Sequence, residues 1–353
     1  MQIARARFPR LSFKSLSAKL KGMKEYAAIP GIGAISAEYL QDFLELEVGG
    51  DGAWHVGQDG VCAILAPLDQ RAEFIVFKDK TLGFVKSALG PPALYPLLDD
   101  IFSAPAEAVL MDLDGTSVRS EHFWMWIIEQ SIARLKGDRG FHLQAEDEPH
   151  VSGHSVSEHL QYCIDKYTPG GSLSEARRHY FEITSYEMNE IAEGRGRYDA
   201  FQPSPGLKEF LLELKRRGVK IGLVTSGLYQ KAWPEILSAF RSLNMGNPLD
   251  FYDAIITAGD RLTKGQTGTL GELAPKPHPW LYAETAYVGL AIDRRRRHKV
   301  IGLEDSGAGV VSIRLAGFAA IGIGGGNIDR SGVRPLLHDY CGSLLDALPV
   351  ILG

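Results

Sequence analysis

Two aspartates stand close together where an apolar run of the chain ends. The run Ala108–Met111 leads directly into Asp112, and Asp114 follows two residues later. Side chains two residues apart in an extended chain point in the same general direction. One carboxylate can attack phosphorus as a nucleophile, and the other can give a proton to the leaving oxygen and later take one from water. Gly115 permits a tight turn close to a phosphate. Aspartate and glycine also form ordinary turns, so this alternative stays open for the segment alone.

Hydroxyl groups and a lysine suited to binding phosphate lie further along the chain. The apolar run Val219–Val224 ends at Thr225 and Ser226, whose hydroxyl and backbone amide groups can hydrogen-bond a phosphoryl oxygen. Such residues also cap helices, which is the alternative interpretation. Lys276 lies between two prolines, which stiffen the backbone and hold its charge at a defined point. The alternative interpretation of Lys276, taken alone, is an ordinary exposed lysine in a loop. We expect the neighbouring His278 to lie on the surface.

Two adjacent acids, Glu304 and Asp305, follow the apolar run Val300–Leu303. With Asp112 and the backbone carbonyl of Asp114, they could complete an octahedral oxygen site for Mg²⁺. Their alternative role is to cap the helix that follows. All four groups of residues fall at or near the ends of apolar runs, which capping alone does not explain. Together they offer the nucleophile, acid/base, hydrogen-bond donor, cation and metal ligands that phosphoryl transfer needs.

The apolar runs that carry these residues are continuous rather than alternating, which is typical of strands buried on both faces of a parallel sheet. The five predicted strands are Ala108–Met111, Val219–Val224, Ala254–Ile256, Val300–Leu303 and Ala319–Ile323. Helical segments, including Leu207–Arg217 and Gly309–Leu315, lie between them. This alternation predicts an α/β fold with a doubly wound, Rossmann-like parallel sheet, in which ligands bind beyond the carboxyl ends of the strands.

More than 100 residues separate the first two predicted strands, whereas an α/β loop usually has about 2–6. Apolar spacing predicts helices at Glu121–Leu135, Val156–Lys166 and Leu173–Glu193. The polar stretch 137–153 is predicted to be a loop. We interpret residues 119–202 as a helical cap inserted into a catalytic core formed by residues 106–118 and 203–353.

Residues 1–105 have a different pattern, and we expect a small N-terminal α+β module of unknown role. We predict helices at Leu16–Tyr26 and Ile35–Leu46, strands at Val61–Leu65 and Phe74–Phe77, and one more helix after Leu89-Gly90-Pro91-Pro92. The segment Ile29–Gly33 between the first two helices looks like a helix-hairpin-helix element, which would bind nucleic acid. We favour the alternative of a tight turn between packed helices, so nucleic acid is not the expected partner.

Composition narrows the class of protein. The formal charge of −5 predicts no bulk affinity for nucleic acid. No stretch approaches the roughly 18 apolar residues that span a bilayer, so we expect no membrane association.

The first 24 residues hold seven basic side chains and no acidic one, which indicates a solvated arm or, alternatively, an organellar transit peptide. The three cysteines lack metal-ligand spacing and favour a reducing compartment, so we expect a cytoplasmic protein. The basic run 294–299 is interpreted as a solvated loop.

Residues 106–330 resemble the haloacid dehalogenase superfamily, in particular its branch close to phosphoglycolate phosphatase and β-phosphoglucomutase. The matching motifs are Val109–Thr116, Leu223–Ser226, Lys276–Pro279 and Gly302–Ser306. The resemblance implies that Asp112 is the nucleophile and a Mg²⁺ ligand. It implies that Asp114 is the general acid/base, with its backbone carbonyl also on the metal. An aspartate at this second position separates the phosphatases from the dehalogenase branch.

The resemblance also assigns the remaining site residues. Thr225 and the amide of Ser226 would hold the transferring phosphoryl group. Lys276 would neutralise charge between the nucleophile and the phosphate. Asp305, with Glu304, would complete the metal site. The implied protein is a Mg²⁺-dependent phosphatase that hydrolyses a small phosphate monoester, such as a sugar phosphate or a phosphoglycolate-like compound, through an aspartyl-phosphate intermediate.

Two positions depart from the family pattern. Arg119 stands where relatives have an acid, which bears on substrate contacts or on the hinge to the cap. Sugar-phosphate mutases carry a histidine near the position where this chain has Trp124. A histidine, His122, lies two residues before it. A mutase that shares the aspartyl-phosphate step therefore remains the alternative to a phosphatase.

Overall fold

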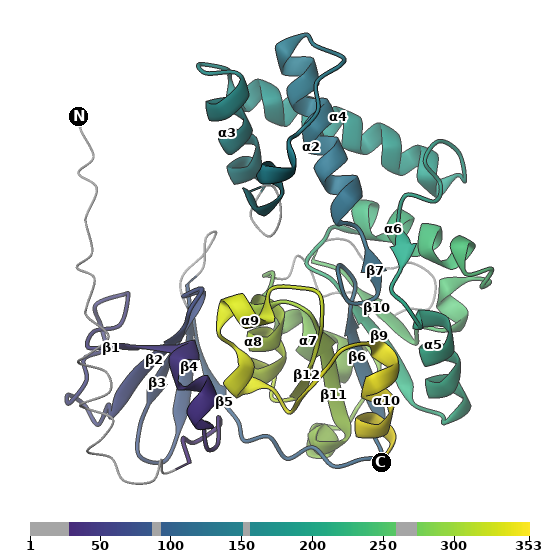
Figure 1. Ribbon diagram of the computed structural model, residues 1–353. Coiled ribbons are helices and arrows are strands. Elements are labelled where there is room, and N and C mark those ends of the chain that lie inside the picture. Colours follow the sequence, from purple (N-terminus) through teal and green to yellow (C-terminus); the bar gives the residue numbers. More distant parts are fainter. Residues whose placement is uncertain (1–27, 87–92, 151–155, 259–273) are drawn as a thin grey trace.

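The centre of the computed structural model, which describes residues 28–86, 93–150, 156–258 and 274–353, is a parallel sheet of six strands (Figure 1). In spatial order they are β10 (Ala254–Ile256), β9 (Lys220–Val224), β6 (Ala108–Asp112), β11 (Val300–Glu304), β12 (Ala319–Ile323) and β13 (Asp339–Cys341). Every residue of β6, β11 and β12 is buried, as expected of strands covered on both faces. The five predicted strands and the doubly wound α/β fold are confirmed. Strand β13 was not predicted, because an edge strand this short and polar carries little signal.

The register of the central strands brings the predicted motifs to one edge of the sheet. Strand β6 pairs in parallel with β9, with Asp112 beside Val224. On its other side β6 pairs with β11, with Met111 beside Leu303. The residues that follow these three strands therefore meet at the same edge, the carboxyl one.

Alternate side chains of β6 point to opposite faces of the sheet and into two different hydrophobic clusters. Val109 and Met111 pack with α5, α6 and α10, whereas Ala108 and Leu110 pack with α7 and α8. These helices are α5 (Leu207–Arg216), α6 (Tyr229–Ser242), α7 (Trp280–Glu284), α8 (Gly307–Leu315) and α10 (Leu344–Leu352), and the short α9 (Ile328–Ser331) follows β12. Short turns complete this part: the 3-10 segments Pro248–Asp250, Arg294–Lys299 and Arg334–Leu336, and a π-helical turn, Thr285–Gly289.

Three long helices stand beyond the carboxyl edge of the sheet, at the top of Figure 1. They are α2 (Glu121–Lys136), α3 (Val156–Tyr167) and α4 (Leu173–Ala192), and a 3-10 turn, Ala145–His150, lies between the first two. Each predicted cap helix is present, with ends within one residue of those expected. The chain enters and leaves this part through a two-stranded antiparallel ribbon of β7 (Val118–Arg119) and β8 (Gln202–Pro203). Two crossings that lie side by side are suited to act as a hinge.

The N-terminal part is an antiparallel sheet rather than a mixed helical module. Its strands follow one another in sequence order: β1 (Phe43–Leu46), β2 (Ala63–Pro67), β3 (Ala72–Val76), β4 (Thr81–Val85) and β5 (Ala93–Leu97). The predicted helix at Ile35–Leu46 is wrong: Ala37–Asp42 is a 3-10 helix, and β1 then pairs with β2. The helix expected after the Gly-Pro-Pro stretch is also wrong, because that segment is β5, paired with β4. In both places strand pairing overrides the local apolar spacing.

A helix-hairpin-helix element at Ile29–Gly33 would need a second helix after the turn, and the expected one at Ile35–Leu46 is not present. The first expected helix, Leu16–Tyr26, lies outside the described residues. Ile29 and Gly33 instead close a short turn through backbone hydrogen bonds of 2.7 and 2.9 Å. A glycine-rich turn of this kind that leads into a 3-10 segment and a strand lacks the two-helix scaffold of that nucleic-acid element.

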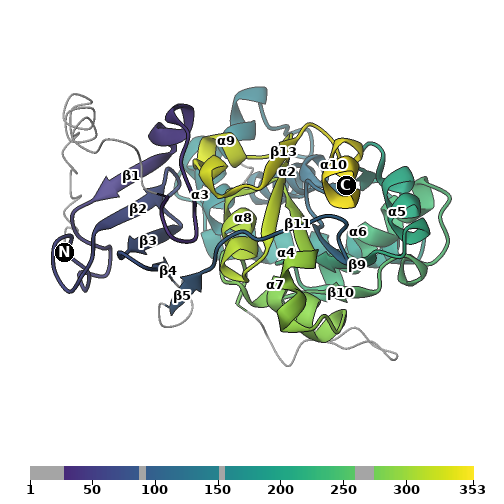
Figure 2. The ribbon, with the colours of Figure 1, turned by 90° about the horizontal axis from the view of Figure 1, so that it is seen from below.

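The N-terminal sheet packs on α8, as both views of the ribbon show (Figures 1 and 2). Phe74 and Val85 from the sheet and Val310 and Ile313 from α8 are buried in one hydrophobic cluster. We call residues 28–98 the N-terminal module. Because the module and the parallel sheet share this cluster, burial of their common apolar surface holds them together.

Polar contacts fix the chain where it leaves the module. The buried Arg314 donates hydrogen bonds to the backbone carbonyls of Gly31 and Leu98, at 2.7 and 3.0 Å. Arg297, from the basic run 294–299, donates to the carbonyl of Asp99 at 3.0 Å. The first three arginines of that run are exposed, in agreement with a surface segment. Among the described residues, none of the helices combines the length and apolarity needed to cross a bilayer.

Asp100, in the segment that leaves the module, forms a pH-sensitive pair with His338, the residue before β13, and their side chains are 2.9 Å apart. The hydrogen bond to Asp100 raises the pKa of His338 above its usual value, although burial opposes this. Burial favours neutral Asp100, but the hydrogen bonds from His338 and from the amide of Phe102 outweigh it and lower the pKa of Asp100. The pair therefore stabilises the fold most at a pH above about 4 and below about 6.5, the ordinary values of the two groups.

We expect His338→Gln to lower the free energy of unfolding by about 0.5–1 kcal/mol near pH 5.5. The difference from the wild type should shrink at alkaline pH, because the native His338 loses its proton as the pH rises through its raised pKa. Denaturant unfolding of both proteins at acid and alkaline pH measures this difference in the free energy of unfolding. The control is His142→Gln, at an exposed histidine. An equal difference at both pH values would contradict the assignment.

Candidate active site

A lysine is buried between two carboxylates at the carboxyl edge of the sheet. The ammonium of Lys276 forms ion pairs with Asp112, the last residue of β6, and with Glu304, the last residue of β11. The three side chains are 8%, 7% and 0% exposed. The interpretation of Lys276 as an exposed loop lysine is therefore wrong. Both carboxylates outweigh the effect of burial and raise the pKa of Lys276, so the amine is charged.

Glu304 is held by protein donors on both of its oxygens. Besides Lys276, Oε1 accepts a hydrogen bond of 2.9 Å from the hydroxyl of Tyr282. Oε2 accepts from the amides of Asp305 and Ser306 and from the Ser306 hydroxyl, at 2.9–3.1 Å. A Cβ at Gly309 would overlap the Glu304 carboxylate, so α8 needs a glycine there. Glu304 thus caps the turn before α8, which is one of its two expected roles, and it also neutralises Lys276.

Asp112, Glu304 and Asp305 form a cluster of three buried carboxylates, each offering an oxygen within 4.8 Å of the others. Burial and the Glu304 charge raise the pKa of Asp112 well above its usual range and that of Asp305 to about 8. The hydroxyl of Thr116 donates to Asp305 at 3.3 Å. The backbone at Gly115 has φ +87°, and a Cβ there would overlap the Asp305 carboxylate. Carboxylate oxygens are the ligands that Mg²⁺ prefers, so the donor set fits this ion.

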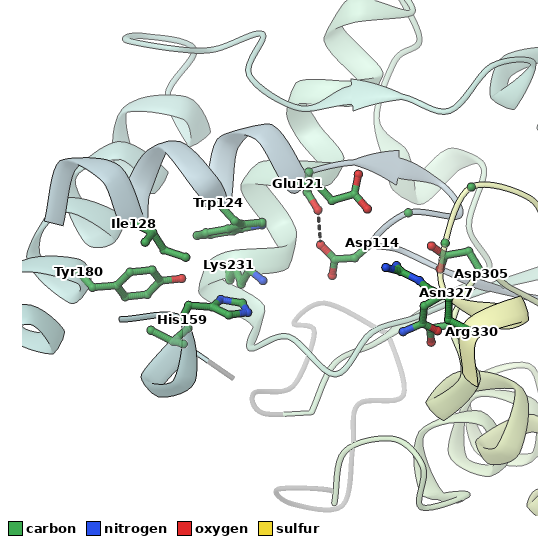
Figure 3. A pocket seen from close by; sticks show the side chains of 16 residues that line it. Asp114, Glu121, Trp124, Ile128, His159, Tyr180, Lys231, Asp305, Asn327 and Arg330 are labelled. Carbon is green, nitrogen blue, oxygen red and sulfur yellow. Dashed lines mark hydrogen bonds between the residues drawn. The ribbon is translucent and has the colours of Figure 1, made fainter. Parts of the chain in front are cut away.

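Asp114 lies beside this cluster and beside a second lysine (Figure 3). Its carboxylate accepts a hydrogen bond of 2.7 Å from the hydroxyl of Ser120. Burial favours the neutral acid, but the ammonium of Lys231 and the Ser120 bond outweigh it and lower the pKa of Asp114. Glu235, one helical turn from Lys231 and 4.0 Å from its ammonium, is fully buried. Burial and the charge of Asp114 raise the pKa of Glu235 well above its usual range.

Thr225 and Ser226 follow β9 at the same edge. Thr225 is buried, and its hydroxyl oxygen accepts a hydrogen bond of 2.9 Å from the amide of Gly227. Ser226 is exposed, and its hydroxyl accepts a bond of 3.2 Å from the amide of Lys276. Ser226 therefore holds the lysine loop, a role that the sequence did not indicate. His278, expected on the surface, is only 6% exposed, which corrects that expectation.

A cavity of about 370 Å³ lies between the cap helices and the edge of the sheet. The cap contributes Trp124 and Ile128 from α2, Val156 and His159 from α3, and Tyr180 from α4. The core contributes Asp114, Gly115, Lys231, Asp305, Ser306, Gly325, Gly326, Asn327 and Arg330. The Lys231 ammonium lies 4.1 Å from the centroid of the Trp124 ring. The cavity thus combines aromatic walls with two basic groups beside the carboxylates.

Sequence reasoning did not find Lys231, Tyr180, His159 or Arg330. They come from α6, α4, α3 and α9, and each reaches the cavity only through helix packing. One weak signal was available, because Lys231 and Glu235 are spaced four residues apart and so share a helix face.

Comparison with known proteins agrees with this fold. A family model described as haloacid dehalogenase-like hydrolase matches residues 106–317. Among solved structures, a predicted phosphoglycolate phosphatase from Haemophilus somnus 129PT is similar, with 15% identity, a TM-score of 0.52, and coverage of 70% of this chain and 98% of that chain. A subfamily IA, variant 1 hydrolase from Geobacter sulfurreducens PCA has 17% identity, a TM-score of 0.50, and coverage of 71% and 98%. At these identities the likeness shows a shared fold.

We expect Lys276→Met to destabilise the protein by about 3–5 kcal/mol in the presence of a chelator, because it leaves two buried carboxylates without their cation. Excess Mg²⁺ should restore more stability to the variant than to the wild type, since the carboxylates have then lost the ammonium that neutralises them. Denaturant unfolding with chelator and with Mg²⁺ measures both effects. Lys215→Met, which breaks a surface pair with Asp253, is the matched control and should cost about 1 kcal/mol or less. A variant as stable as the wild type in chelator would refute the expectation.

Proposed function

Because the chain belongs to the haloacid dehalogenase-like hydrolase family, we propose that it is a Mg²⁺-dependent phosphatase that hydrolyses a small phosphate monoester. A sugar phosphate or a phosphoglycolate-like compound is the proposed class of substrate. The observation that carries the proposal is the buried Lys276 ammonium between Asp112 and Glu304, with Asp114 beside the open cavity. A phosphoryl group that approached from the cavity would meet a nucleophile, an acid and a cation in one place.

In the proposed first step, a carboxylate oxygen of Asp112 attacks phosphorus. A new O–P bond forms, the P–O bond of the ester breaks, and Asp114 gives a proton to the departing oxygen. In the second step, water attacks the phosphorus of the aspartyl phosphate. Asp114 takes the proton of that water, the bond to Asp112 breaks, and inorganic phosphate leaves.

The charges of the site support this assignment. The transferring group carries negative charge on three oxygens, and Lys276 is fixed where it can neutralise part of it. Mg²⁺ held by Asp112, Asp305 and the carbonyl of Asp114 would neutralise the rest when bound. Both oxygens of Glu304 already accept bonds from the protein, so we propose that Glu304 acts on the metal site mainly through Lys276.

Thr225 and Ser226 are the proposed holders of the phosphoryl oxygens. Thr225 follows the strand that pairs with β6, so its position relative to Asp112 is set by the sheet register. The Ser226 hydroxyl also anchors the backbone of Lys276. The phosphate-binding residues and the catalytic lysine would therefore be held in one arrangement before substrate arrives, as electrostatic catalysis requires.

The cap side of the cavity supports hydrolysis of a small anion over the mutase alternative. A volume of about 370 Å³ suits a small molecule. Trp124 lines the cavity. The resemblance puts the mutase histidine near this position, and an indole transfers no proton. His122 lines a separate cavity with Met125 and Trp126, so it does not replace that histidine.

The central test is phosphate release from a panel of monoesters that includes phosphoglycolate and hexose phosphates. We expect release with Mg²⁺ and none with chelator, and Asp112→Asn should lower kcat by about 10³-fold or more, because it removes the nucleophile. Asp114→Asn should lower kcat by about 10²–10⁴-fold, as loss of a general acid does.

Product analysis separates the alternatives. An isomeric sugar phosphate without inorganic phosphate would show a mutase. No turnover by folded, Mg²⁺-loaded protein, or full activity of Asp112→Asn, would refute the proposal.

We expect Lys231→Met to lower kcat/KM for phosphoglycolate by about 10–100-fold, because Lys231 faces the cavity and can pair with a carboxylate on the substrate. The loss should be smaller for p-nitrophenyl phosphate, whose leaving group carries no carboxylate. Steady-state kinetics with both substrates measures the difference, with Lys215→Met as the control on the surface. An equal loss for the two substrates would show that Lys231 does not recognise the leaving group.

A further inference from the structure

The loop that carries Lys276 is in contact with the N-terminal module. Tyr95, on β5 of the module, places its hydroxyl 2.9 Å from Nδ1 of His278. The rings of Tyr95 and His278 meet edge to face, with centroids 5.9 Å apart, and Tyr95 packs in the same way on Trp280. The module therefore touches both residues that flank Pro279, just after the proposed catalytic lysine.

His278 is fixed from a second side as well. The hydroxyl of Ser312, on α8, donates a hydrogen bond of 2.6 Å to the backbone carbonyl of His278, and this contact is buried. His278 itself is 6% exposed. Burial lowers the pKa of His278, so the imidazole between these partners is neutral. Its side chain and its backbone are thus both held, one by the module and one by the core.

The position of this loop decides where the Lys276 ammonium lies. Lys276 is two residues from His278, and its amide is bound to Ser226 on the other side. The ammonium must contact Asp112 and Glu304 at once, and both of these are rigidly placed at strand ends. The Lys276 side chain is buried against both carboxylates and the Tyr282 ring, so a shift of its backbone changes the position from which its ammonium meets the two acids. Displacements of about 1 Å are enough to cost much of a catalytic effect.

The module is attached firmly enough to serve as a support. Its inner face is part of the hydrophobic cluster that includes α8. A Cβ at Gly83 of β4 would overlap the side chain of Leu315, which shows how closely the sheet and the helix approach. Arg314, the residue before Leu315, binds the carbonyls of Gly31 and Leu98 at the two ends of the module. Strand β5 and helix α8, the two elements that hold His278, are therefore fixed relative to each other.

We propose that the N-terminal module is a positioning element of the active site, and that Tyr95 is a positioning residue that acts on Lys276 through His278. Tyr95 itself lies outside the cavity residues and touches no reacting group. Its effect is on the geometry of Lys276 and so on the catalytic step rather than on substrate binding. The kinetic part of this inference rests on the proposed phosphatase activity.

Tyr95→Phe in the full chain tests the proposal, because it removes only the hydroxyl that meets His278. We expect kcat to fall roughly tenfold, with KM changed less than about twofold and the unfolding midpoint nearly unchanged. Ser312→Ala removes the other bond to His278 and should give the same changes. Tyr287→Phe is the matched control, since this half-buried tyrosine packs on Phe318.

A second readout does not depend on turnover. The rate at which acetic anhydride modifies the Lys276 amine, followed by mass spectrometry, should rise several-fold in Tyr95→Phe, because a loosened loop exposes an amine that is 8% exposed in the native protein. Tyr287→Phe should leave this rate unchanged. If the wild type releases no phosphate from any monoester, the proposed function fails, and labelling alone then decides the positioning role. Unchanged kcat and unchanged labelling in Tyr95→Phe would overturn the inference, as would a rise in KM without a fall in kcat.

Discussion

The buried contact of the Lys276 ammonium with Asp112 and Glu304 is the constraint on which the rest of the site depends. Burying charges is costly unless each is paired and hydrogen-bonded. The pairing here joins two strand ends and a loop that lie far apart in the sequence. The fold must therefore bring β6 and β11 into register and hold the lysine loop against both. Asp305 is a third carboxyl group buried beside Asp112 and Glu304, and a divalent ion bound there would favour the ionised form of all three acids.

The sheet, the glycines and the cap each contribute to the arrangement around Lys276. The parallel sheet sets the spacing of the acids, because neighbouring strands end at the same edge. Glycines at positions 115 and 309 let the backbone approach the carboxylates where a Cβ would collide. The cap, joined by the β7·β8 ribbon, covers the open side with Trp124, Tyr180 and His159, whereas Lys231 and Arg330 come from the core. The placement of the acids is thus a property of the core, whereas the opposite wall of the cavity comes from the cap.

The sequence predicted the parts of the site that sit directly after strands and missed those that depend on packing. Asp112, Thr225 and Glu304 each end a continuous apolar run, so finding the strands also placed these residues at one edge. Lys231 lies on α6, and the packing of α6 against neighbouring elements decides which of its side chains reach the cavity. Strands β2 and β3 were predicted, but β1, β4 and β5 were missed for a related reason. Segment 35–46 has helix-like apolar spacing, and only pairing with β2 makes its second half a strand.

The residues that the family model matches are not by themselves a complete structural unit in this chain. The match begins at residue 106, yet the apolar face of α8 is covered by the N-terminal sheet, and the two share one buried cluster. Without the module, Val310 and Ile313 would meet water, at a cost of about 25 cal/mol for each Å² of apolar surface exposed. Arg314 would lose its carbonyl partners at Gly31 and Leu98 as well. The antiparallel sheet buries Ile64, Ile75 and Phe84 in a cluster of its own on one face, and α8 covers the other face, which carries Phe74 and Val85. Stability of the module and geometry of the catalytic edge are therefore coupled through the same helix.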